Sequence, residues 1–247
     1  MQLTVLGSSG GYPEPGRACS GYLLQRDRFS IWIDAGTGTL DALQRIVNLG
    51  KLEGILLSHT HPDHWTDLPI ALHRIAVTGE GMEYPPVAVY GAPDWTVTTG
   101  VAFQWYSDGN SPTPYTPFEM KHGDVYKLGG IYIDIAEVQH SVPTFAMRFE
   151  RDSVLVYSAD TAPCDALIEL ARDADVFLCE ATLPPGEEAA ISMNPEQAGQ
   201  IARAAGVKQL ILTHLLPGID PEESCRVAAG VFDGPVTWAQ PGRVFEI

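Results

Sequence analysis

Six consecutive residues, His59-Thr60-His61-Pro62-Asp63-His64, bring three imidazoles and one carboxylate together. Neutral imidazoles and carboxylates are the ligands that zinc and related divalent ions take in proteins. The run follows the apolar stretch Gly54–Ser58, which predicts a buried strand, and Pro62 within it argues against a helix. The sequence therefore predicts a metal site in an irregular loop at the end of a strand.

Three further polar residues lie just past apolar runs elsewhere in the chain. His140 follows Ile131–Val138, Asp160 follows Val154–Tyr157, and His214 follows Leu210–Leu212. Because fixed sites are best held by rigid elements, ligands at strand ends are expected. We therefore predict that these three side chains join the site.

The seven residues fit a two-metal site. The expected ligands are His59, His61 and His140 for one ion and Asp63, His64 and His214 for the other, with Asp160 bridging the two. Metals about 3.5–4 Å apart can share a hydroxide that attacks an electrophilic centre while both ions stabilise the developing oxyanions. Zinc fits these ligands best, although manganese or iron also suits an oxygen-rich position.

Asp34 follows a predicted strand, Phe29–Ile33. Two interpretations stay open: it accepts a hydrogen bond from a ligating imidazole and fixes the tautomer of that ring, or it is an ordinary turn residue. His73 lies in a helical pattern and His122 in a turn pattern, and neither is assigned a role.

Strands outnumber helices among the elements that must position these residues. Further strands are expected over Leu3–Leu6, Tyr22–Leu24, Ile55–Leu57, Val87–Val89, Val176–Cys179 and Val236–Trp238, and helices over Leu40–Leu49, Cys164–Asp173, Pro195–Ala205 and from Asp220 onward. In the clearest helix Asn194 can cap, Pro195 takes the first position and Gly206 ends the helix. With no linker, charge block or repeat in view, we expect one α/β or α+β domain over residues 1–247.

The segment Thr78–Pro117 is rich in glycine, proline and aromatic residues. One interpretation is a packed connection with some helix. The other is a lid or wall that stacks on a substrate ring or on a second subunit, which would be compatible with a homodimer.

The chain carries 31 acidic and 15 basic residues, a net charge of −16. This charge disfavours extended nucleic acid, which binds basic surfaces through counterion release. A small anionic ligand stays open, because bound divalent ions dominate the local field. No apolar run approaches the roughly 20 residues needed to span a membrane. The N-terminus lacks signal-peptide features and the four cysteines are scattered, so we expect a cytoplasmic protein without a membrane partner.

The ordered set of ligands resembles the metallo-β-lactamase superfamily over nearly the whole chain. The resemblance implies a four-layer αββα sandwich with a dinuclear site at the edge of its two sheets. Flavodiiron oxidases of this superfamily place glutamate where this chain has His61. The histidine favours hydrolysis over redox chemistry.

Longer motifs resemble the ribonuclease Z-like phosphodiesterases in particular. They are Leu6–Gly11 with Pro15–Ser20, His140–Phe145, Tyr157–Thr161 and Cys179–Thr182. The glycine-rich run is not a P-loop, since it lacks the Gly-Lys-Ser/Thr ending. Within this resemblance Glu180 is a candidate for proton handling or for orienting a ligand; a structural carboxylate bonded to backbone is the alternative.

Three departures separate the chain from ribonuclease Z. Cys179 replaces a histidine, Ser192 stands where a further histidine helps protonate the leaving oxygen, and no room exists for a tRNA-gripping arm between Asp160 and His214. Small bacterial relatives that resemble cyclic-nucleotide phosphodiesterases share the short architecture and the Cys-Glu-Ala segment.

The leading hypothesis is a dinuclear-metal phosphodiesterase acting on a small phosphodiester such as a cyclic nucleotide. Asp63 and Glu180 are its candidate catalytic residues, and Trp65 either stacks on a substrate base or covers the metals. The alternatives are a tRNA 3′-end-processing endoribonuclease, a lactone or thioester hydrolase, and a metal-stabilised binding protein without turnover.

Overall fold

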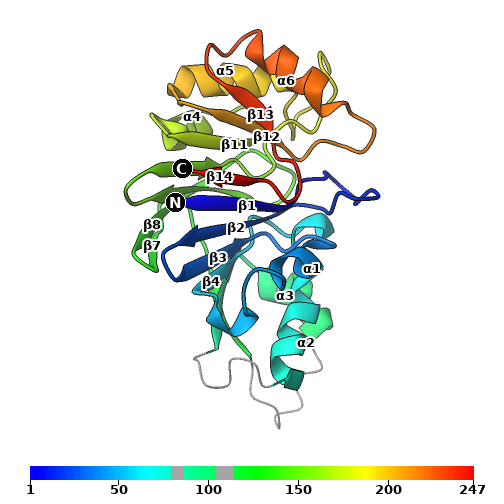
Figure 1. Cartoon of the computed structure of the whole chain (residues 1–247), viewed down its shortest axis with the longest axis vertical. Coiled ribbons are helices and arrows are strands. Elements are labelled where there is room, and N and C mark those ends of the chain that lie inside the picture. Colours follow the sequence, from blue (N-terminus) through cyan, green and yellow to red (C-terminus); the bar gives the residue numbers. More distant parts are fainter. Residues whose placement is uncertain (79–85, 104–113) are drawn as a thin grey trace.

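A computed structural model describes residues 1–78, 86–103 and 114–247. Within this part of the chain, two seven-stranded sheets lie face to face between two outer layers of helices (Figure 1). The four-layer αββα sandwich implied by the sequence is confirmed. None of the described helices has the length and apolar character needed to cross a bilayer.

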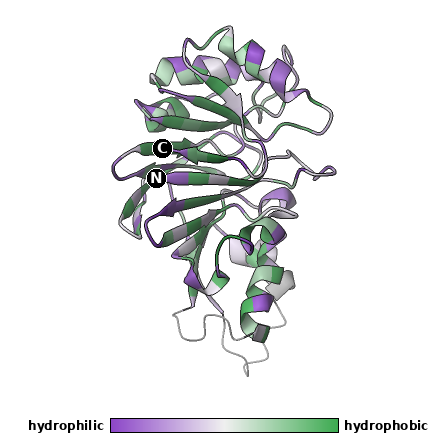
Figure 2. Cartoon of the chain, in the orientation of Figure 1, coloured by the Kyte–Doolittle hydropathy of each residue, from purple (hydrophilic) through white to green (hydrophobic). Residues whose placement is uncertain are grey.

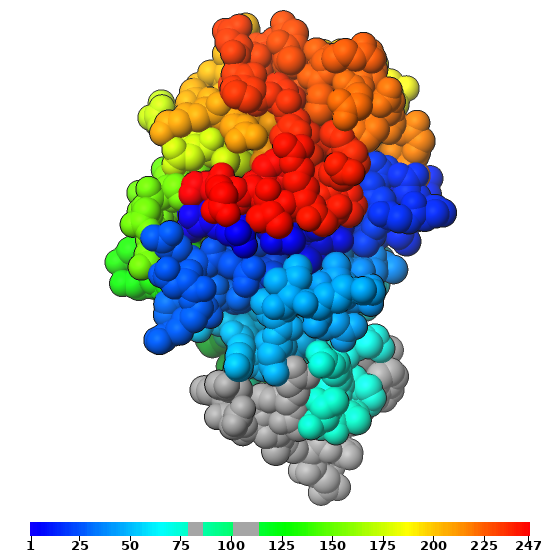
Figure 3. All heavy atoms as spheres, viewed as in Figure 1, coloured from blue at the N-terminus to red at the C-terminus, as the bar shows by residue number. Residues whose placement is uncertain are grey.

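The first sheet comes mainly from the N-terminal half. Its strands, in spatial order, are β14 (Val244–Glu246), β1 (Gln2–Gly7), β2 (Gly21–Arg26), β3 (Phe29–Ile33), β4 (Gly54–Leu56), β5 (Val87–Gly91) and β6 (Tyr115–Glu119). The strands from β3 to β6 are parallel. The C-terminal strand β14 pairs with β1, so the last residues, red in Figure 3, lie against the first residues, in blue.

The second sheet carries the other ligands. Its strands, in spatial order, are β13 (Val236–Trp238), β12 (Leu210–Thr213), β11 (Val176–Glu180), β10 (Val154–Tyr157), β9 (Phe145–Glu150), β8 (Ile131–Glu137) and β7 (Val125–Leu128). β10, β11, β12 and β13 are parallel, and β8 runs in the same direction because β9 is antiparallel to both β8 and β10. The carboxyl ends of β8, β10, β11 and β12 therefore meet at one edge.

Three apolar layers hold the sandwich together. Side chains such as Leu24, Ile133 and Phe149 fill the space between the sheets. The outer face of the first sheet packs under α1 (Thr39–Leu43), α2 (Leu68–Thr78) and α3 (Trp95–Phe103), and that of the second under α4 (Asp165–Ala171), α5 (Pro195–Ala205) and α6 (Pro221–Ala229). Figure 2 shows apolar strands inside and polar residues on the outer helices. Burial of this kind stabilises a fold by about 25 cal/mol per Å² of apolar surface.

Helix ends follow their capping residues closely. At α5, Asn194 accepts a hydrogen bond from Gln197 N (2.8 Å), and Gly206 ends the helix in the left-handed region at φ 68°.

The predicted helix Leu40–Leu49 is wrong in its second half. α1 ends at Leu43, and the Asn48 side chain instead caps a separate 3-10 turn, η1 (Leu49–Lys51), by accepting from Gly50 N at 2.9 Å.

The segment Thr78–Pro117 is described only in part. Residues 79–85 and 104–113, on which much of the predicted lid or wall falls, lie outside the described residues. In the described part Trp95 is buried and donates its indole N–H to Phe118 O at 3.0 Å. The burial of Trp95 agrees with the interpretation of this segment as a packed connection.

Candidate metal centre

The predicted ligand run forms two short pieces after β4. His59, Thr60 and His61 continue in irregular structure, and Pro62–His64 then makes a single 3-10 turn, η2. Proline suits the first position of such a turn, because its fixed φ is compatible and its missing N–H would have no partner there. The turn buries Asp63 and His64 while His61 stays half-buried.

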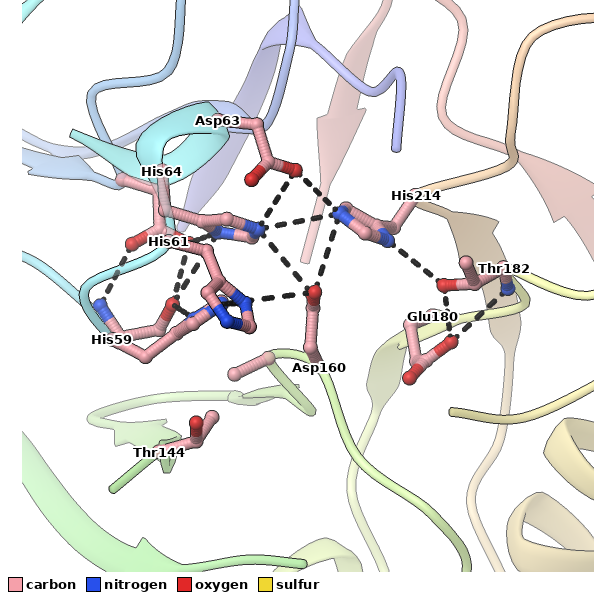
Figure 4. A network of polar contacts seen from close by, with 12 residues as sticks. His59, His61, Asp63, His64, Thr144, Asp160, Glu180, Thr182 and His214 are labelled. Atoms are coloured by element: carbon pink, nitrogen blue, oxygen red, sulfur yellow. Dashed lines mark hydrogen bonds and ion pairs between the residues drawn. The ribbon is translucent and has the colours of Figure 1, made fainter. Parts of the chain in front are cut away.

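All seven predicted ligands converge at the edge of the two sheets (Figure 4). The structure gathers them as His59, His61, His140 and Asp160 in one cluster and Asp63, His64 and His214 in the other, with the ligand atoms of each cluster within 4.8 Å of one another. We call His59, His61 and His140 the first ligand group and Asp63, His64 and His214 the second ligand group.

Nitrogen atoms meet closely in the first ligand group. His61 Nδ1 lies 3.0 Å from His59 Nε2 and 3.1 Å from His140 Nε2. Three imidazole nitrogens aimed at one point form the kind of half-shell that a divalent ion completes.

The second ligand group has the same character with one oxygen. His214 Nε2 lies 3.2 Å from His64 Nε2 and 3.1 Å from Asp63 Oδ2. A mixed nitrogen and oxygen donor set of this kind suits zinc and also accepts manganese or iron.

Asp160 lies between the groups and faces both. Its Oδ2 is 3.7 Å from His59 Nε2 and 3.4 Å from His214 Nε2, and its Oδ1 is 3.4 Å from His64 Nε2. The Oδ1 atom is fully shielded, yet it makes no hydrogen bond with any described residue. A buried carboxylate oxygen that makes no hydrogen bond and only a 3.4 Å contact with His64 Nε2 is costly, so this atom fits the position of a metal ligand.

The ring nitrogen that points away from the cluster is bonded in each of the five histidines. The contacts are His59 Nδ1 to Ser58 Oγ (3.0 Å), His61 Nε2 to Ser141 Oγ (3.4 Å), His140 Nδ1 to Ile191 O (2.7 Å), His64 Nδ1 to Asp34 Oδ2 (2.8 Å) and His214 Nδ1 to Thr182 Oγ1 (2.8 Å). Such outer bonds fix the tautomer and leave the inner nitrogen with a free lone pair.

Asp34 supports one histidine of each group. Its buried carboxylate accepts hydrogen bonds from His64 Nδ1 and from Ser58 Oγ (2.9 Å), and Ser58 in turn contacts His59. Tyr157, which the sequence analysis did not select, donates its hydroxyl to Asp34 Oδ2 at 2.7 Å. Asp34 thus makes the imidazole contact that the first interpretation requires, and its effect on the tautomer of His64 stays a prediction.

Strained backbone conformations gather at the same edge. Asp34, Ala159 and His214 adopt φ values of 52°, 54° and 56°. Non-glycine residues in this region cost about 1–3 kcal/mol each and persist only where the surroundings hold them. Here each strained residue turns the chain just after a strand so that a ligand or its support faces the centre.

The charges of the cluster suit cation binding. Burial lowers the pKa of His59 and of His61, so both imidazoles are neutral near pH 7. Against the effect of burial, His64 and His214 hold the pKa of Asp63 and of Asp160 well below the usual range. Burial likewise opposes a charge on His64 and His214, but Asp160 raises the pKa of both. A cation bound at these imidazoles would therefore compete with protons.

Glu180 lies behind His214 and contacts the site indirectly. The fully buried carboxylate accepts from Thr161 N (2.7 Å), Met193 N (3.2 Å) and the Thr182 hydroxyl (2.5 Å). Burial, followed by the charge of Asp160, raises the pKa of Glu180 to about 7. Because Thr182 donates to Glu180, its oxygen is left to accept from His214 Nδ1, which places Thr182 between the two (Figure 4).

Three other residues considered from the sequence are outside the two ligand groups. The Trp65 indole donates to Thr60 O at 3.0 Å, and its ring packs against the apolar layer under α1 and α2. A stacking role for Trp65 stays a prediction. His73 and His122 are exposed.

The Thr182→Val variant tests the support of His214. Valine keeps the shape but removes the acceptor for His214 Nδ1 and the donor to buried Glu180, so His214 loses its tautomer preference. We expect zinc to bind the centre about 10–100-fold more weakly, as outer-contact changes at metal sites typically do. Competition with a chromophoric chelator measures this affinity. Thr182→Ser, which keeps the hydroxyl, should bind like the wild type, and equal weakening in both variants would contradict the role.

Several known proteins are similar to this chain. The model of the beta-lactamase superfamily domain matches residues 30–215. Uncharacterized protein ML1173 of Mycobacterium leprae is 36% identical over 260 residues, covering 100% of this chain and 89% of that protein. "Ribonuclease Z" of Mycobacterium bovis is 27% identical, covering 96% and 94% of the two chains.

A solved structure matches over the full length. "Probable metallo-hydrolase YhfI" of Bacillus subtilis is 32% identical over 253 residues, and the alignment covers 100% of this chain and 100% of that protein. The crystal structure of YhfI superposes with a TM-score of 0.87 at 28% identity, covering 100% of this chain and 99% of that one.

Proposed function

Because this chain belongs to the beta-lactamase superfamily, as a metal-dependent hydrolase of the ribonuclease Z-like branch, we propose that it hydrolyses a small phosphodiester such as a cyclic nucleotide. The observation that carries the proposal is the position of Asp160 between two complete ligand groups. Two divalent ions bound by these groups would supply a nucleophile at neutral pH and would stabilise charge on the attacking and leaving oxygens. We propose zinc for both positions.

The chain's own residues would hold and orient the reacting groups. The first ligand group and Asp160 would bind one ion, and the second ligand group and Asp160 the other. Asp63 is ionised, since its pKa is held low by His214 and His64. It is therefore able to accept a hydrogen bond from an attacking water as well as to bind metal.

Proton delivery to the leaving oxygen favours a cyclic substrate. Ser192 is buried where ribonuclease Z would carry a histidine acid, and the Glu180 oxygens are occupied by backbone and Thr182 bonds. A cyclic diester keeps its leaving oxygen tethered, so it depends less on a strong acid. The net charge of −16 also favours a small substrate over extended nucleic acid.

A substrate panel tests this proposal. The purified protein with zinc or manganese should hydrolyse bis-p-nitrophenyl phosphate and 3′,5′-cyclic nucleotides, and a chelator should abolish the activity until metal is returned. Product release is followed by absorbance and by chromatography. Cleavage of a precursor tRNA in preference to cyclic nucleotides would favour the ribonuclease Z alternative, which the 27% identical relative makes the second candidate.

Two other outcomes would contradict the proposal. Activity on lactones or thioesters alone would assign carbon-centred hydrolysis to the same centre. Tight metal binding with no hydrolysis across the panel would indicate a metal-stabilised binding protein.

A further inference from the structure

The glycine-rich run Leu6–Gly11 contacts the second ligand group. A Cβ added at Gly10 would lie 2.5 Å from His214 O, 3.0 Å from His214 Nδ1 and 3.1 Å from His214 Cε1. The Gly10 amide also donates to Leu215 O at 3.0 Å, next to His214 in the chain. Only glycine lets the N-terminal loop approach this histidine so closely.

The same loop holds Asp63. Gly11 N donates to Asp63 Oδ2 at 2.8 Å, so a backbone amide from the N-terminal loop fixes the carboxylate that also faces His214 Nε2. In Figure 4 the N-terminal ribbon, in faint blue, runs close to the labelled Asp63 and His214. A glycine outside this loop, Gly36, leaves room for the backbone of Asp63, since a Cβ added at Gly36 would lie 2.1 Å from Asp63 O.

The first ligand group has no such support. At no described glycine are the nearest neighbours of an added Cβ atoms of His59, His61 or His140. The outer ring nitrogens of these histidines are bonded instead by Ser58, Ser141 and Ile191, which lie far from the N-terminal loop in sequence. Asp34 and Ser58 support a histidine of each group, whereas the contacts of Gly10 and Gly11 go to the second ligand group.

We infer that Gly10 and Gly11 position the second ligand group, so that the second metal position can be lost while the first is kept. The inference rests on the two-metal site of the proposed function. It gives the glycine-rich run a structural task at the centre that differs from phosphate binding by a P-loop. Gly10 sets the place of His214 by close contact, and Gly11 sets the carboxylate of Asp63 by a hydrogen bond.

The Gly10→Ala variant tests the inference by metal content. The added methyl group must displace His214, because the atom nearest to it is the backbone oxygen of His214. This oxygen cannot move aside unless the rest of His214 moves with it. After dialysis against a chelator of moderate strength, we expect two zinc ions in the wild type and one in Gly10→Ala. Titration should show a second affinity that is weaker by about tenfold or more, with the first unchanged.

Gly16→Ala is the matched control from the same loop. Gly16 has φ 82° and nothing within 4 Å of an added Cβ, so alanine there strains the loop without touching a ligand. This variant should keep two zinc ions. Adding Gly10→Ala to His61→Ala, in which only the second position should bind, should remove the remaining ion and so identify the position affected.

Each other outcome is decisive. Two ions with wild-type affinities in Gly10→Ala would overturn the role of Gly10. Loss of both ions, an unfolded Gly10→Ala chain, or loss of an ion in Gly16→Ala as well would overturn the claim that one position is affected selectively. A single ion in the wild type would instead contradict the two-metal site, and with it the proposed function.

Discussion

Asp160→Ala should lower the hydrolysis rate by about 10³-fold or more and reduce the zinc bound by the purified protein. Asp160 is the carboxylate that faces both groups, at 3.7 Å from His59 Nε2 and 3.4 Å from His214 Nε2. Without it neither position would have its complete donor set, and one of the two carboxylates that offset the charge of two cations would be lost. A pair of metal ions stabilises the transition state by several kcal/mol. The loss of about 4 kcal/mol of this stabilisation corresponds to the expected 10³-fold decrease in rate. Metal analysis and initial rates measure the two effects.

Asp165→Ala is the matched control for Asp160→Ala. Asp165 is an exposed carboxylate in the first turn of α4, only five positions further along the chain. Its loss should change neither metal content nor rate. An Asp160→Ala protein that kept two ions and the wild-type rate would show that Asp160 does not bridge.

The convergence of the candidate ligands was predictable because strand ends can be seen in the sequence. His140, Asp160 and His214 each follow an apolar run, and the runs became β8, β10 and β12. Strands that share a direction place their carboxyl ends at the same edge, so polar residues after such runs gather there. The chemistry of histidine and aspartate then limits what the gathered residues can bind.

The supports of the ligands were not predictable in the same way. Thr182 and Tyr157 are ordinary residue types, and their partners His214 and Asp34 lie 32 and 123 positions away in sequence. No local pattern encodes such contacts, since they depend on how the two sheets pack. The close approach of Gly10 to His214 is hidden for the same reason.

Several elements of the fold were also missed. β6 (Tyr115–Glu119) is largely exposed and contains Pro117, while β14 (Val244–Glu246) has only three residues. Short edge strands carry little apolar alternation, so periodicity does not reveal them. A single domain over residues 1–247 stays a prediction.

His61→Ala should empty the first position and abolish measurable turnover while the chain stays folded. His61 Nδ1 approaches the ligating nitrogens of His59 and His140 at 3.0 and 3.1 Å, so its loss leaves that ion with two imidazoles and Asp160. The side chain is half-buried, and its outer nitrogen makes only a 3.4 Å contact with Ser141. Since a substitution at such a site changes stability by about 1 kcal/mol or less, thermal unfolding of the metal-free protein should be nearly unchanged.

A matched control separates loss of a ligand from loss of any histidine. His122→Ala removes an exposed imidazole that accepts one hydrogen bond, from Glu137 N at 3.2 Å, and should keep two ions and full activity. One ion and no turnover in His61→Ala would mean that hydrolysis needs both positions, because the second ligand group is left intact. Turnover that survived with a single ion would instead assign catalysis to the second ligand group alone, and the first would then serve only to hold the structure together.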